Sequence, residues 1–65
     1  MKVSYFEDTD TLYIEFKGHA VDDTQNLDEN TIMDLDEEGN VVAITLEHAS
    51  LRTDVSNLTL SGIAA

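Results

Sequence analysis

The chain of 65 residues contains no cysteine and no proline. Without cysteine there is no thiol nucleophile and no disulfide framework of the kind that holds many small secreted domains together, so a reducing cytoplasm is the expected compartment. The longest uninterrupted apolar run, residues 41–44, is far shorter than the roughly 20 residues of a membrane-spanning helix. We therefore expect a cytoplasmic protein that does not enter a membrane.

Positive charge is also scarce, because three Lys and Arg residues stand against fourteen Asp and Glu, for a net charge of −11. Such a surface repels phosphate backbones and anionic lipids, which argues against nucleic acid and membranes as partners and favours a basic protein. Crowded carboxylates should raise some of one another's pKa values, so we expect salt and moderate acidification to stabilise the fold.

Hydrophobic residues make up 42% of the chain, a share typical of globular domains, so the charge does not by itself predict disorder. A chain of this length buries only about 60% of the surface that its unfolded form exposes, which leaves no room for a second core. We therefore expect a single domain over residues 1–65.

Alternation of apolar and polar residues predicts strands at residues 2–6 and 11–16, with a polar turn at residues 7–10 between them. In the second strand one face should carry Leu12, Ile14 and Phe16, and the other Tyr13 and Glu15. Residues 20–27 are mostly polar, so a third strand there fits an edge or a face turned to water. The pattern is that of one continuous antiparallel meander.

Residues 31–46 contain two apolar segments joined by a turn at residues 36–40. Asp36 opening a type I turn and Gly39 in the left-handed position predict a three-residue hairpin loop with a bulge, in which Asp36 pairs with Asn40. The register then sets Leu35 opposite Val41, Met33 opposite Ala43 and Ile32 opposite Ile44, with Ile32, Val42, Ile44 and Leu46 on one face and Met33, Leu35, Val41 and Ala43 on the other. Both faces would be apolar, so we expect a homodimer or higher oligomer in which a neighbouring copy covers one of them. The alternative is that the tail at residues 55–63 folds over that face.

The periodicity changes after Leu46. Residues 47–52 favour a short helix, whereas residues 53–57 have lower helix propensity. One or two helical turns followed by an extended tail are expected, and a single helix to about residue 60 is the alternative. The predicted fold is α+β, mainly β: an antiparallel β-meander of about four to five strands with a short helix after residue 46.

Residues 34–39 begin like a calcium-binding loop, with carboxylates at alternate positions followed by glycine. The twelfth position, however, is Thr45 rather than the bidentate Glu of an EF-hand, and strands flank the segment. The hairpin turn already accounts for Asp36 and Gly39, so no metal site is predicted.

No other residues form a catalytic pattern. His19 and His48 have no second His or Cys at metal-ligand spacing, and the serines lie outside any nucleophile elbow. The adjacent carboxylates at residues 22–23 and 37–38 are expected to be solvated charge. No catalytic, cofactor-binding or metal-binding residue and no cofactor is predicted. The alternative is a small metal-dependent or hydrolytic enzyme with His19, His48 and acidic residues at a dimer cleft.

The aromatic residues are Tyr5, Phe6, Tyr13 and Phe16. A stacking platform for single-stranded nucleic acid would also need a basic groove, which three basic residues do not supply. Packing in the core or in an interface is therefore expected. Tyr13, on the less hydrophobic face of its strand, is the candidate anchor for a partner.

A sequence pattern spreads over most of the chain. It consists of Tyr5, Asp10, Leu12, Tyr13 and Ile14, then Leu27, Asp28, Ile32, Asp34, Leu35, Asp36 and Gly39, and finally Val41, Val42, Ile44, Leu46, Ala49 and Ser50. Over residues 1–52 this pattern resembles a family of small bacterial proteins, domain of unknown function 2283. The resemblance implies a compact β-meander with a short helix and brings no established activity.

Members of such families sometimes lie beside small toxin-like proteins, which suggests an antitoxin-like role by analogy alone. Together these observations predict a small, acidic, self-associating interaction module without enzymatic activity, regulatory or antitoxin-like, that binds a basic protein partner.

Overall fold

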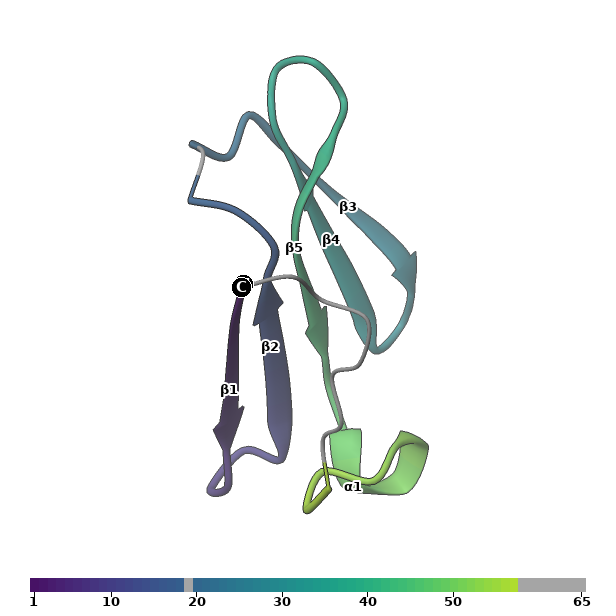
Figure 1. Ribbon diagram of the computed structural model, residues 1–65. Coiled ribbons are helices and arrows are strands. Elements are labelled where there is room, and N and C mark those ends of the chain that lie inside the picture. Colours follow the sequence, from purple (N-terminus) through teal and green to yellow (C-terminus); the bar gives the residue numbers. More distant parts are fainter. Residues whose placement is uncertain (19, 58–65) are drawn as a thin grey trace.

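The computed structural model describes residues 1–18 and 20–57. These described residues form five strands and one short helix (Figure 1). These are β1 (Lys2–Phe6), β2 (Thr11–Glu15), β3 (Asp23–Asp28), β4 (Thr31–Leu35), β5 (Val41–Leu46) and α1 (Ala49–Arg52). Every strand pair is antiparallel and all five strands share one sheet. The predicted α+β, mainly β fold is confirmed.

The strand order is β1-β2-β5-β4-β3, so the meander is continuous only within β1–β2 and within β3–β4–β5. β2 pairs with β5, and the chain crosses after β2 to the far edge of the sheet (Figure 1). Composition explains this order, because all six residues of β3 are exposed and a polar strand is tolerated at an edge. The expectation of an edge position for the third strand is confirmed, and that of one continuous meander is confirmed only in part.

The β4–β5 hairpin departs from the predicted register after its first pair. Leu35 lies opposite Val41, as expected, but the next pair is Asp34 with Ala43, so Val42 is an extra residue in β5. Beyond this β-bulge Met33 pairs with Ile44 and Ile32 with Thr45, in place of the predicted Ala43 and Ile44. Because side chains alternate with a period of two, one inserted residue exchanges the faces of every later pair.

The bulge makes the two faces of the sheet unlike. The first, which we call the apolar face, is defined by the side chains of Val3, Tyr5, Leu12, Ile14, Met33, Ile44 and Leu46, and it also carries the polar residues Thr31 and Gln25. The second, the mixed face, carries Lys2, Ser4, Tyr13, Glu15, Ile32, Asp34, Ala43 and Thr45. The predicted assignment of faces in β2 is confirmed, but the prediction that the hairpin is apolar on both faces is wrong.

The buried apolar side chains of the described residues are Val42, Ala43 and Ala49, which are 2%, 0% and 0% exposed. α1 lies beyond the lower end of β5 and closes that end of the sheet (Figure 1). It forms one turn, and Thr53 behind it is extended with φ −154°. The short-helix prediction is confirmed and the alternative of one helix to residue 60 is wrong. The predicted tail beyond residue 57 lies outside the described residues.

Two neighbouring valines test the burial at the bulge. Val42→Ala should lower the free energy of unfolding by about 2 kcal/mol, the range for removing buried methyl groups. Val41→Ala removes the same atoms from a side chain that is 36% exposed. It should lower the free energy of unfolding by only about 0.5 kcal/mol. Urea denaturation followed by circular dichroism measures both. Equal losses would contradict the burial described here.

Candidate interaction surface

Asp36 organises the end of the sheet at the β4–β5 loop. Its Oδ1 accepts hydrogen bonds from the backbone N–H groups of Glu38 (3.0 Å) and Asn40 (2.9 Å). Its Oδ2 lies 3.0 Å from Nζ of Lys17. The backbone N–H of Asp36 donates to the Asn40 carbonyl at 2.9 Å, and Gly39 has φ +84°. The predicted turn residues are thus confirmed, and the carboxylate holds the loop together.

These contacts lower the pKa of Asp36 to about 2, chiefly through the Asn40 N–H and then through Lys17. Hydrogen bonds also lower the pKa values of Asp10, Asp28 and Asp54, with the Tyr5 hydroxyl, the Asn30 N–H and the Ser56 hydroxyl as the largest causes respectively. The expectation that like-charge crowding raises carboxyl pKa values is wrong for these four groups. Local donors outweigh the repulsion.

Acidification should therefore destabilise the fold. The folded-state pKa of Asp36 lies below its ordinary value of 3.8, so its stabilisation is complete above about pH 4 and is lost as the pH falls toward about 2. Asp36→Asn should make the melting temperature less dependent on pH in this window. Glu37→Gln removes the same charge from the exposed neighbour and should keep the dependence of the unmodified protein. Equal pH dependence in both variants would contradict this assignment.

The remaining sequence candidates are dispersed. Asp34 accepts a hydrogen bond from the Thr24 hydroxyl at 2.9 Å on the mixed face, and no cluster of three potential metal ligands occurs within residues 1–18 and 20–57. His48 is exposed and precedes α1 in a left-handed conformation, with φ +54°. His19 lies outside the described residues. The alternative that His19 and His48 share a dimer cleft therefore stays a prediction.

Sequence reasoning missed a cluster around Asp10, in the turn between β1 and β2. The Tyr5 hydroxyl donates to Oδ1 of Asp10 at 2.5 Å. Forty positions along the chain, the Ser50 backbone N–H donates to the same oxygen at 3.1 Å and its hydroxyl to Oδ2 at 2.7 Å. The Ala49 N–H donates to the Asp10 carbonyl at 2.9 Å. Asp10 thus caps α1 from another part of the chain, which His48 at the N-cap position does not do.

Arg52 fixes the other end of α1. Its Nη1 donates to the Asn30 carbonyl at 2.7 Å and its Nη2 to the Thr31 hydroxyl at 2.6 Å, while Asp28 lies 3.7 Å away. The helix is therefore attached to the β1–β2 turn at one end and to the β3–β4 turn at the other. No local spacing signals these contacts. The one signal in the sequence was the family pattern, which includes Asp10 and Ser50.

Loss of the Asp10 side chain tests this connection. Asp10 has φ +53°, and glycine accepts that conformation, so Asp10→Gly removes the hydrogen bonds without backbone strain. The melting temperature should fall by about 4–8 °C, the shift expected for loss of a helix cap in a domain of this size. Asp8→Gly, in the same turn, is the matched control and should shift it by less than half as much. Similar shifts would show that turn flexibility, and not the cap, is responsible.

The apolar face is incompletely covered by the described chain. The seven side chains that define it are all partly exposed, with Tyr5 at 37%. Residues 53–57 border it, and a groove of about 350 Å³ separates them from the strands. The groove is lined by Val3, Tyr5, Leu12, Ile14, Leu46, Thr53, Asp54, Val55 and Asn57. A sheet face of this kind offers apolar contact area to a partner.

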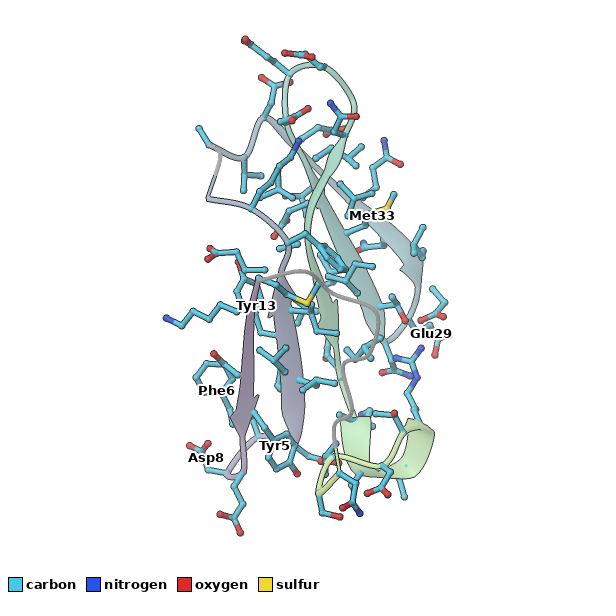
Figure 2. The ribbon with its side chains drawn as sticks, in the orientation of Figure 1. Tyr5, Phe6, Asp8, Tyr13, Glu29 and Met33 are labelled. Carbon is cyan, nitrogen blue, oxygen red and sulfur yellow. The ribbon has the colours of Figure 1, made fainter. Side chains whose placement is uncertain are left out.

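The predicted aromatic packing is absent from the core of the described residues. Phe6 and Phe16 are 51% and 39% exposed, and Tyr13 is half-buried on the mixed face. Tyr5 and Phe6 point to opposite sides of β1 (Figure 2). A place for these side chains in an interface remains a prediction.

Acidic side chains gather at both ends of the sheet. At the end that carries the β4–β5 loop, Asp22, Asp36, Glu37 and Glu38 line a hollow of about 420 Å³ together with Ala20 and Val21. At the end that carries α1, Asp8 lies in the β1–β2 turn and Glu29 in the β3–β4 turn (Figure 2). We call these two acidic ends of the sheet its rims. The apolar face lies between them.

A family model described as "Protein of unknown function (DUF2283)" matches residues 2–50. The chain belongs to this family. The DUF2283 match includes all five strands, the Asp36 loop and both Asp10 and Ser50, whereas residues 53–57 at the rim of the groove lie beyond it. Comparison with curated proteins and with solved structures gives no match. Among the residues that the structure describes, no helix of this DUF2283 protein is long and apolar enough to cross a membrane.

Proposed function

We propose that the protein is a non-enzymatic, self-associating interaction module of the cytoplasm that binds a basic protein partner. The observation that carries this proposal is the partly exposed apolar face lying between two acidic rims. An antitoxin-like or regulatory role is one form that such a module takes, and it rests on analogy with the neighbours of similar families.

The apolar face supplies the area for binding. Leu12, Ile14 and Leu46 lie side by side on the central strands β2 and β5 and line the groove beside residues 53–57. Branched aliphatic side chains in a shallow depression can hold a few apolar anchors of a partner, and such anchors provide most of the affinity of an interface.

Charge defines the chemistry of the partner. Two of the three basic residues are engaged by the chain's own groups, Lys17 by Asp36 and Arg52 by Asn30 and Thr31. Most carboxylates therefore have no basic side chain to neutralise them, and the electrostatic field outside both rims is negative. Such a field accelerates encounter with a basic protein and rejects acidic ones. The partner we propose has apolar side chains between flanking Lys or Arg residues.

The dispersion of the catalytic candidates supports a role in binding over one in catalysis. The Ser50 hydroxyl is used in the Asp10 cluster, and His48 is exposed next to α1. A nucleophile needs a base within hydrogen-bonding distance and an enclosed site for the reacting atom. No observation on the described residues favours the hydrolytic alternative.

Binding of defined peptides tests the proposal. A fluorescent 12-residue peptide of alternating Leu and Lys should bind, and its Leu–Glu counterpart should not. Stopped-flow anisotropy should show the association rate falling at least tenfold between roughly 20 mM and 300 mM salt, because screening removes electrostatic steering. An association rate that does not respond to salt, or equal binding of the acidic peptide, would disprove the charge argument.

Two adjacent residues of β2 distinguish the faces in the same assay. Ile14→Thr, on the apolar face, should raise the Kd for the Leu–Lys peptide at least fivefold, whereas Tyr13→Thr, on the mixed face, should change it less than twofold. The reverse result would assign docking to the mixed face and to Tyr13, the anchor expected from the sequence, in place of the apolar face proposed here.

A further inference from the structure

Among the strands that the structure describes, β1 and β3 lie at the two edges of the sheet (Figure 1). An edge strand presents unpaired backbone N–H and C=O groups that can pair with a strand of another molecule, and proteins block this with charges and bulges. β3 has both devices: Asp23 and Asp28 lie at its ends, and its pairing with β4 is irregular between Asn26 and Asp28.

β1 has no bulge and no carboxylate, and its one charged side chain is that of Lys2 at its first position. Its sequence is KVSYF, and its five residues pair with β2 in an unbroken register. Tyr5 and Phe6 are 37% and 51% exposed, so the strand also presents apolar surface on both sides. In a chain with a net charge of −11, β1 is thus the edge at which two copies meet with the least repulsion between carboxylates.

From these observations we infer that the protein self-associates by antiparallel pairing of β1 with β1 of a second copy, which joins two sheets into one of ten strands. This inference rests on the self-association in the proposed function and names its surface. Two-fold symmetry makes the contact isologous, so the same five residues serve both copies.

Symmetry also sets the register. All five residues of β1 pair only if Ser4 lies on the two-fold axis opposite Ser4 of the second copy. Val3 then lies opposite Tyr5, which makes a β-branched and aromatic cross-strand pair on the apolar face. Lys2 lies opposite Phe6 of the second copy, so the two lysines stay apart. The apolar face continues across the new seam, which enlarges the surface available to a basic partner.

Engineered cysteines test the pairing in the full chain, because the natural sequence has no cysteine. Ser4 and Asn26 lie in one cross-strand row, Ser4–Tyr13–Thr45–Ile32–Asn26, at opposite edges and on the same face. Directly opposite residues bring their Cβ atoms to about 4.5–5.5 Å, near the reach of a disulfide. Under mild oxidation, Ser4→Cys should form covalent dimers at least tenfold faster than Asn26→Cys. Equal rates, or faster dimerisation of Asn26→Cys, would overturn the inference.

A second pair of variants uses charge instead of a crosslink. Ser4→Asp places two carboxylates opposite each other on the axis and should raise the dimer Kd at least tenfold, whereas Asn26→Asp adds the same charge at the other edge and should change it less than twofold. Sedimentation or light scattering gives the Kd, and circular dichroism verifies folding. If the unmodified chain has the mass of one copy at all concentrations, self-association itself is disproved. If it dimerises but Ser4→Asp has no effect, only the β1 surface is wrong.

Discussion

The extra residue Val42 in β5 decides which side chains share a face, and the rest of the structure depends on that choice. It brings Met33 into line with Ile44 and, through β2, with Ile14 and Val3. A regular ladder would have divided these apolar residues between two surfaces. With the bulge, one face becomes apolar and the other collects most of the polar side chains. The sheet can then expose its mixed face to water while its apolar face remains available for contact.

Because the core is so small, hydrogen bonds at the two ends of the sheet do much to hold the fold together. Asp36 closes the loop between β4 and β5, and Asp10 and Arg52 attach α1 to turns that belong to different parts of the sheet. Each group contacts backbone atoms as well as side chains, which fixes turn geometry more strictly than contacts between side chains alone. The carboxylates of Asp36 and Asp10 therefore stabilise the fold in addition to contributing negative charge.

Local patterns in the sequence were sufficient for the strands, the turns and the short helix. Alternation placed Tyr13 and Ile14 on opposite faces, and Asp36 with Gly39 identified the hairpin loop. The bulge at Val42 could not be predicted, because a run of four apolar residues, 41–44, reads equally well in either register. The contact between Asp10 and Ser50 was also beyond reach, since it spans forty positions. At the interaction surface, composition predicted the acidic charge, but only the corrected register located the apolar face.

The pairing of β2 with β5 has a consequence for how the chain acquires its structure. β1–β2 and β3–β4–β5 each contain only neighbouring strands, so each can form from local contacts, whereas their junction joins Leu12 to Leu46 and Ile14 to Ile44. Pairing β2 with β5 closes the long loop between Leu12 and Leu46. Because no earlier contact stabilises that loop, it closes slowly compared with a hairpin. On the ribosome, β2 emerges with its inner edge unpaired and waits until β5 has been synthesised. The order of strands therefore imposes an interval in which the early hairpin is exposed.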